Sequence, residues 1–87
     1  MDRTRKHNLE LSKKAYIAVA PKLEEKIRSD IYEYIHEVNE WGLGVETIID
    51  YLVEEEIELS KEEMEALSEA ASSMAINRGL EMVKVIG

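Results

Sequence analysis

The stretch Leu23–Val38, LEEKIRSDIYEYIHEV, decides the fold of this chain of 87 residues. Pro21 stands shortly before it, where a proline either begins a new helix or kinks a continuous one. We favour the break and predict a helix from Pro21 to about Asn39. The large apolar side chains of the stretch recur every three or four residues, the period of a helix with one buried face: Leu23, Ile27, Ile31, Tyr34, Ile35 and Val38.

Two later segments carry the same period, which predicts a helix from about Leu43 to Glu55 and another from Ser60 to about Ala75. The joint before the first of them, Asn39–Gly44, is short and contains two glycines, so the helices on either side of it should be antiparallel. Because Glu63 follows Ser60 by three residues, these two side chains predict a capping box at the start of the last helix. Asn77-Arg78-Gly79 is its expected stop.

The ends of the chain are less regular. Residues 1–8 are polar and basic, and we expect a disordered head there, followed by a single helical domain over residues 9–87. A first helix is expected from Leu9 or Leu11 to Val19. The apolar tail over residues 80–87 fits either a short helical turn or an edge strand. Together these segments predict an all-α fold, a small antiparallel bundle of three to four helices.

The chain has no cysteine, so neither disulfides nor a cysteine-based zinc site can hold the fold together. The basic residues from Arg3 to Lys14 precede an apolar run, as in a secretory signal. That run, Ala15–Ala20, is too short for one and ends at Pro21. No apolar stretch is long enough to span a membrane. We therefore expect a cytoplasmic protein with no membrane partner.

Negative charge is concentrated in one part of the chain. The segment Glu37–Glu69 holds twelve acidic residues and the single base Lys61, a net charge of 1 − 12 = −11, whereas the whole chain has a net charge of −8. The same segment has clear helical periodicity, unlike a disordered acidic tail. It should fold into a strongly negative surface, and such a surface attracts a basic partner.

The sequence offers little for catalysis. His7 lies in the expected disordered head, and helical geometry places His36 on the polar side of its helix, where a solvated imidazole is expected. No glycine-rich phosphate loop, nucleophile elbow or metal-binding motif occurs. An enzyme built on paired carboxylates is the least favoured alternative, since the acids lie on polar faces. We expect no enzyme activity, no cofactor, no metal and, for so acidic a chain, no nucleic-acid partner.

Acidic side chains recur every four residues along the helix expected from Leu43. Like charges at this spacing destabilise a helix, which favours a functional reason for them, although an acidic face also keeps a small protein soluble. Trp41, the only tryptophan, could anchor an interface beside these acids or pack in the core. A second acidic flank is formed by Asp30, Glu33 and Glu37. The predicted partner-binding residues are Glu37, Glu40, Trp41, Glu46, Asp50, Tyr51 and Glu54.

Three features of the second half occur in a fixed order: the step Asn39-Glu40-Trp41, the acid-bearing helix over Gly42–Leu52, and the motif IELSKEE at Ile57–Glu63. In this order the chain resembles the Maf-type family of bacterial immunity proteins, which more often has alanine at the position of Gly44. The resemblance covers roughly half of the chain. It implies a small helical inhibitor of a polymorphic or contact-dependent toxin, whose C-terminal nuclease domain is often a ribonuclease of the EndoU type.

The charge pattern fits that expectation independently. A nuclease holds phosphates in a basic cleft, so an inhibitor that presents fixed carboxylates can occupy the cleft and associate quickly with it. We therefore expect an immunity protein that neutralises a cognate toxin by binding its nuclease domain. The alternative is an acidic helical adaptor or regulatory subunit that binds another basic protein. The sequence leaves open which toxin is bound and whether the toxin's active site or a neighbouring surface is covered.

Overall fold

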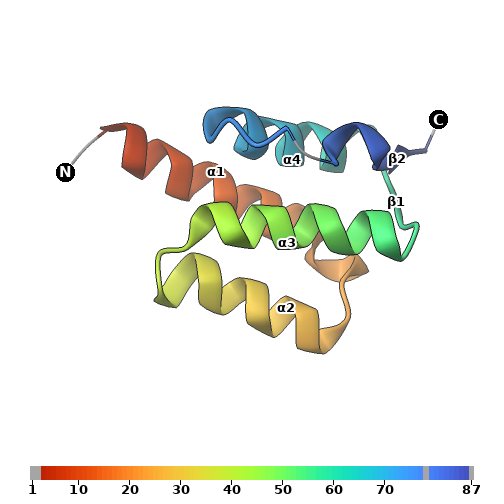
Figure 1. Ribbon diagram of the computed structural model, residues 1–87, viewed down its shortest axis with the longest axis horizontal. Coiled ribbons are helices and arrows are strands. Elements are labelled where there is room, and N and C mark those ends of the chain that lie inside the picture. Colours follow the sequence, from red (N-terminus) through yellow and green to blue (C-terminus); the bar gives the residue numbers. More distant parts are fainter. Residues whose placement is uncertain (1–2, 78, 87) are drawn as a thin grey trace.

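The computed structural model describes residues 3–77 and 79–86, and these form a bundle of four α-helices (Figure 1). Successive helices run in opposite directions, so the predicted antiparallel all-α bundle is confirmed. None of the described helices is both long and apolar enough to cross a membrane. The helices are α1 (Arg3–Val19), α2 (Glu25–Tyr32), α3 (Trp41–Glu54) and α4 (Lys61–Ser73).

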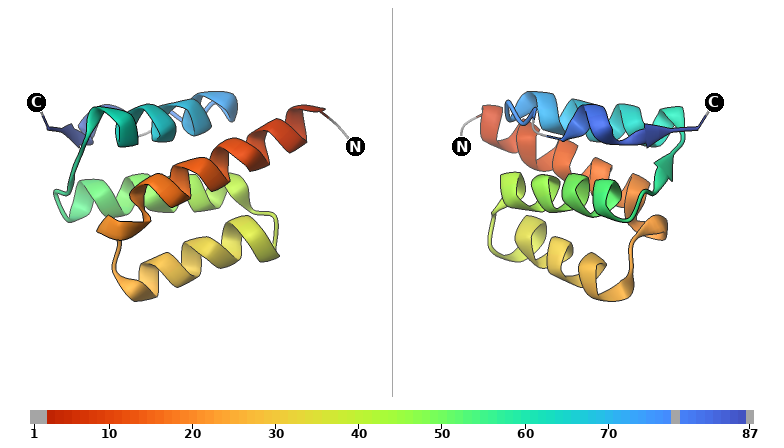
Figure 2. Two further views of the ribbon diagram at one scale, coloured as in Figure 1. Left: turned by 180° about the vertical axis from the view of Figure 1, so that it is seen from behind. Right: turned by 45° about the vertical axis from the view of Figure 1, so that its right-hand side comes forward.

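Helices α1 and α3 occupy the middle of the bundle, with α4 on one side and α2 on the other (Figure 2). α1 makes its most extensive contact with α4 and also packs on α3, which in turn contacts both α2 and α4. Apolar side chains from all four helices meet between them, because each helix has one apolar stripe to remove from water. The fully buried large side chains are Val19, Ile31, Ile35, Val45, Ile48, Ile49, Leu52, Leu59 and Leu67.

Helix α1 begins at Arg3, so residues 3–8 are helical where the sequence predicted a disordered head. Residues 1–2 of that head lie outside the described residues. The helix starts earlier because its first turns contact other segments, and a polar sequence does not show such contacts. Leu9 packs against the core, and the Arg5 guanidinium lies 5.4 Å from the centroid of the Trp41 ring. A cation above an aromatic face is stabilising, and here it ties the first turns of α1 to the start of α3.

The break at Pro21 is confirmed, but α2 begins four residues later than predicted. Pro21 sits in a 3₁₀ turn, η1 (Ala20–Lys22), where its missing N–H leaves no hydrogen bond unmade. After α2 the chain widens into a π-helical turn, η2 (Glu33–Glu37), in which the Val38 N–H donates to the Glu33 carbonyl at 3.1 Å. Asn39, with φ 55°, then reverses the chain.

Helix α3 begins at Trp41, two residues before the predicted start, because its two glycines are helical rather than part of the connection. Gly44 is required by packing. A Cβ atom there would lie 2.7 Å from Cγ1 of the buried Ile35. The absence of a side chain at this position therefore allows α3 to approach η2 closely.

Helices α3 and α4 end in the same way. The second residue after each end has positive φ (Glu56, 50°; Ala75, 55°). The N–H of the residue that follows bonds back over five residues, from Ile57 to Leu52 at 3.0 Å and from Ile76 to Ala71 at 2.8 Å. These are Schellman caps. Both isoleucines pack against the core. α4 thus ends before the predicted stop at Asn77-Arg78-Gly79, whose Arg78 lies outside the described residues.

The predicted capping box at the start of α4 is confirmed. The Glu63 N–H donates to the Ser60 hydroxyl at 3.2 Å, and the Ser60 N–H donates to the Glu63 carboxylate at 2.7 Å. The C-terminal tail contains both of the structures that the sequence allowed. A 3₁₀ turn, η3 (Leu80–Met82), is followed by strand β2 (Lys84–Val85), which pairs in parallel with β1 (Glu58–Leu59).

Candidate partner-binding surface

An acidic ridge runs along the exposed face of α3 and consists of Glu46, Asp50 and Glu54. All three side chains are exposed, because the opposite face of the helix carries the buried residues of the core. Among the side chains that the structure describes, in residues 5–77 and 79–86, no basic group lies within ion-pair distance of these carboxylates. The ridge therefore offers three unpaired acceptors of hydrogen bonds and ion pairs, spaced by about one helical turn each.

Two other acids of the same segment are already paired. The Lys22 ammonium lies 2.7 Å from the Glu63 carboxylate and the Lys84 ammonium 3.0 Å from that of Glu56. The hydrogen bond from Lys22, followed by that from the Ser60 N–H, lowers the pKa of the Glu63 carboxyl below its ordinary value. Glu63 and Glu56 thus form ion pairs with other segments of the chain, whereas the acids of the ridge are unpaired among the described side chains.

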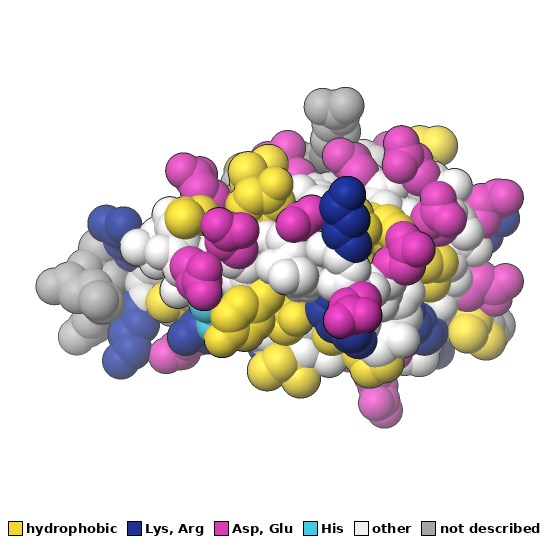
Figure 3. Space-filling model, turned by 90° about the horizontal axis from the view of Figure 1, so that it is seen from below, with side chains coloured by type: hydrophobic (Ala, Val, Ile, Leu, Met, Phe, Trp, Pro, Cys, Tyr) yellow, Lys and Arg dark blue, Asp and Glu magenta, His cyan; other side chains and the backbone are white. Residues whose placement is uncertain are grey.

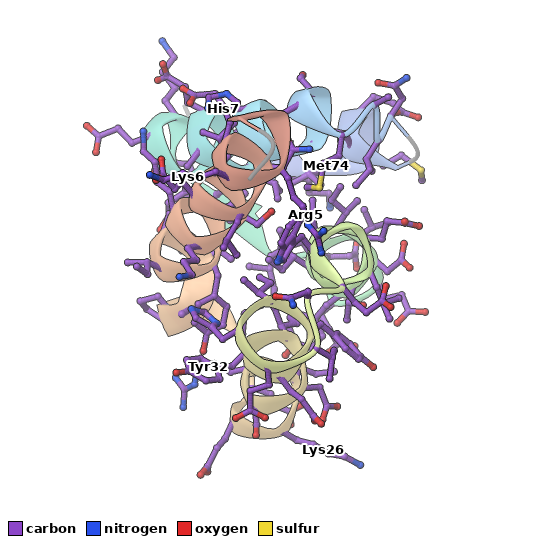
Figure 4. All side chains as sticks on the ribbon, turned by 90° about the vertical axis from the view of Figure 1, so that its left-hand side faces the viewer. Arg5, Lys6, His7, Lys26, Tyr32 and Met74 are labelled. Atoms are coloured by element: carbon purple, nitrogen blue, oxygen red, sulfur yellow. The ribbon has the colours of Figure 1, made fainter. Side chains whose placement is uncertain are left out.

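Trp41 lies against the core rather than standing free at the surface. The indole is partly buried and packs on the core, and Arg5 covers its ring. The Nε1 atom of the indole is buried and has no hydrogen-bond partner among the described side chains. Figure 4 shows Arg5 reaching from α1 toward the start of α3. Tyr51 is also partly buried against the core. Both aromatic residues are therefore partly buried against the core, whereas the acids with which the sequence grouped them are exposed.

Glu37 and Glu40 lie at the other end of α3 from Glu54. Both are exposed, in η2 and immediately before α3. The helical rise puts Glu40 and Glu54 about 20 Å apart along the axis. The seven predicted residues thus form an acidic start of α3, an acidic ridge and two aromatic residues that face the core.

A groove that the sequence did not predict adjoins the ridge. Its volume is about 500 Å³, and it lies between α3 and the C-terminal turn. Asp50 and Glu54 belong to both the ridge and the groove, which brings an acidic rim next to an exposed apolar side chain, Met82. No sequence pattern joins the tail to α3, so only the folded chain reveals this site. We call it the C-terminal groove; it is lined by Asp50, Val53, Glu54, Gly79, Glu81 and Met82.

A second unpredicted feature is an aromatic cluster at the seam of α1 and α2. The rings of Tyr32 and His36 stack at 4.0 Å between centroids, and Tyr16 meets both edge-on at 6.0 and 5.9 Å. His36 is therefore partly buried, not the freely solvated imidazole that the sequence predicted. Burial raises the pKa of the Tyr16 hydroxyl. Figure 4 shows Tyr32 beside α2, on the side of α1.

Acidic side chains are not confined to α3. Figure 3 shows them spread over the face of the molecule seen from below, with hydrophobic side chains exposed between them. Within the described part of the chain, no group of three histidine or carboxylate side chains could hold a metal ion. On this face the carboxylates lie next to small apolar areas, with Lys and Arg side chains among them.

Comparison of the chain with protein-family models, with curated proteins and with solved structures found no match.

Proposed function

We propose that this chain is an immunity protein that binds the basic nuclease domain of a cognate bacterial toxin through the acidic ridge and so neutralises it. The observation that carries the proposal is the ridge itself. Glu46, Asp50 and Glu54 are exposed, lie on one helix face and have no ion-pair partner among the described residues. Three like charges at this spacing weaken the helix that carries them, and a basic partner would remove that cost.

The electrostatics of a nuclease supply the mechanism. Its cleft must hold anionic phosphates, so it is lined with basic groups. Carboxylates fixed on a helix can contact the same groups, exclude the nucleic acid and steer the approach of the two proteins. Ribonuclease chemistry is the form of nuclease that the resemblance to Maf-type immunity proteins implies.

The test starts from the reading frame encoded beside the gene of this protein. Its C-terminal domain is expressed with and without this chain, and RNA degradation and cell growth are measured. The proposal expects toxicity without the chain and protection with it. A neighbouring product that is basic and bound by the chain, but harmless to cells and nucleic acid, would favour the alternative of an adaptor or regulatory subunit.

Charge reversal tests the surface. Glu46→Lys, Asp50→Lys and Glu54→Lys are combined in one variant, and Glu62→Lys, Glu65→Lys and Glu69→Lys on α4 in a matched control with the same change in net charge. All six side chains are exposed, so both variants should keep their helical circular dichroism. The α3 variant should associate at least about tenfold more slowly, with a flatter salt dependence, because steering charges are lost.

The control should lose less of its association rate, because its charges lie on another helix. Equal losses in both variants would mean that net charge alone guides binding. Unaltered rates in the α3 variant would mean that the ridge is merely solvated, and the binding surface would then lie on Asp30, Glu33 and Glu37 or on α4.

A further inference from the structure

We infer that the C-terminal groove receives an arginine side chain of the basic partner, with the aliphatic stem over Met82 and the guanidinium between the acidic side chains of the rim. This inference rests on the proposed function, since it names the chemistry of the partner at one end of the acidic ridge.

One wall of the groove is a single turn of α3. Asp50, Val53 and Glu54 stand three and four residues apart and so share one side of the helix. Val53 is partly buried and packs against the core, which holds this wall in place. The wall therefore offers an apolar floor with a carboxylate at each end.

The other wall is the C-terminal turn, which the core holds against α3. Gly79 has φ +79°, and a Cβ atom on it would lie 3.2 Å from Cγ2 of the buried Ile49, so the turn lies directly on the helix. Val83 is buried and Leu80 packs against the core. These anchors fix the turn while Glu81 and Met82 stay exposed.

The lining combines an exposed apolar side chain with negatively charged carboxylates, and few ligands suit both. Met82 is 62% exposed although it is a large apolar residue, and three carboxylates line the same groove: Asp50, Glu54 and Glu81. A purely apolar side chain in the groove would remove these carboxylates from water without a partner, which is costly. An anion would be repelled. A ligand with an apolar stem and a positive head meets both requirements, as long basic side chains do.

Arginine fits these requirements better than lysine. Its planar guanidinium can form two parallel hydrogen bonds to the oxygens of a carboxylate. It is also more weakly hydrated than an ammonium, so it loses less hydration free energy on entering a partly closed site. The thioether of Met82 is soft and flexible, which favours contact with such a plane. The α3 wall spans about 6 Å, so the groove admits one or two side chains rather than a whole helix.

The experiment compares hexaarginine with hexalysine, two peptides of equal charge, in titrations followed by calorimetry and by ¹H–¹⁵N spectra. Wild-type protein should bind hexaarginine at least about fivefold more tightly, with the largest spectral changes at Val53, Gly79 and Met82. In Met82→Ser this preference should fall, because the guanidinium plane loses the side chain that it lies over. Ile17→Ser is the matched control, because Ile17 is 69% exposed on α1 and the preference should persist when it is replaced.

Equal affinities for the two peptides, or a preference that is undiminished in Met82→Ser, would overturn the inference. Both substituted side chains are largely exposed, so thermal unfolding should be unchanged and loss of fold is readily recognised. The failures of the two proposals are distinguishable. If the ridge reversal abolishes toxin neutralisation while no arginine preference exists, the groove inference fails and the function stands. If the preference depends on Met82 but no neighbouring toxin is neutralised, the proposed function fails and the groove still selects arginine.

Discussion

Helices α1 and α3 pack against each other in the middle of the bundle, yet they differ in charge and in how they are held. α1 carries five basic residues and one acid, whereas α3 carries three acids and no base. α3 buries large side chains along most of its length, such as Ile48 and Leu52. Among residues 5–19 of α1, the buried side chains are Ser12, Ala15 and Val19.

The difference shows two ways to order a helix. α3 is stabilised by its own apolar stripe, which is removed from water against every other helix of the bundle. The first turns of α1 lack such a stripe and depend on contacts made by single side chains, such as Arg5 on Trp41. The difference in charge between α1 and α3 also makes two sides of the molecule differ. α3 faces the viewer in Figure 1 and α1 faces the viewer in the left view of Figure 2, so the acidic helix and the basic helix lie on opposite sides of the molecule. If the proposed function holds, a basic partner would approach the α3 side.

The largest expected effect concerns the close packing of α3. Gly44→Ala should lower the free energy of unfolding by about 1–3 kcal/mol, because the new Cβ atom would lie 2.7 Å from Cγ1 of Ile35 in a filled core. The midpoint of urea unfolding measures the loss. This position is the one at which Maf-type proteins more often have alanine, so the result also bears on how closely this chain follows that pattern.

Gly42→Ala is the matched control, two residues away in the same helix. Nothing lies within 4 Å of a Cβ atom at Gly42, and alanine favours a helix, so this variant should be stabilised by up to about 1 kcal/mol. If both variants gain stability, Ile35 gives way easily and α3 is not in tight contact with η2.

The same contrast explains how much of the fold could be predicted from the sequence. The stripes of α2 and α3 and the Ser60–Glu63 capping box are local patterns, and each predicted a helix that the structure contains. The start of α1 at Arg3, the shift of α2 to Glu25 and the C-terminal groove depend on contacts between distant segments.

The sequence likewise predicted only part of the candidate site. The spacing of Glu46, Asp50 and Glu54 sufficed to place them on one exposed face. Spacing could not show that Tyr51 packs against the core, since it lies at the edge of the apolar stripe. Trp41 was assigned to the connection, whereas in the structure it is helical and lies on the apolar stripe, four residues before Val45. It also carried no signal for Glu81 and Met82, which reach the ridge only because Gly79 lets the tail turn onto α3.

A smaller effect is expected where the α1 side of the molecule meets the acidic segment, at the ion pair of Lys22 with Glu63. Folding lowers the pKa of Glu63, so this carboxylate stabilises the protein above the ordinary pKa of glutamate, about 4.3, and the contribution is lost as the pH falls through the lower folded value. Glu63→Gln should therefore cost up to about 1 kcal/mol at pH 7 and less at acid pH.

Ser60→Ala provides the comparison at the same helix start. It removes a neutral acceptor from the Glu63 N–H and should cost about 1 kcal/mol through most of the pH range. Urea unfolding of both variants at pH 7 and at pH 3 measures the two costs. A penalty of Glu63→Gln that is as large at pH 3 as at pH 7 would show that charge on Glu63 is not what joins Lys22 to α4.

The smallest expected effect tests whether α1 owes its first turns to α3. Arg5→Ala should remove a cation–π contact worth about 0.5 kcal/mol and speed amide hydrogen exchange in the first two turns of α1, with no change in α4. Lys6→Ala is the control, since Lys6 is an exposed base next in sequence. Both substitutions improve helix propensity and remove a positive charge near a helix N-terminus, where it is unfavourable. A loss of stability or of exchange protection that occurs only in Arg5→Ala, together with a change in Trp41 fluorescence, must then come from the lost contact with the indole. If the two variants exchange alike, α1 holds its first turns without Trp41, and the contrast between the two central helices lies in their charge alone.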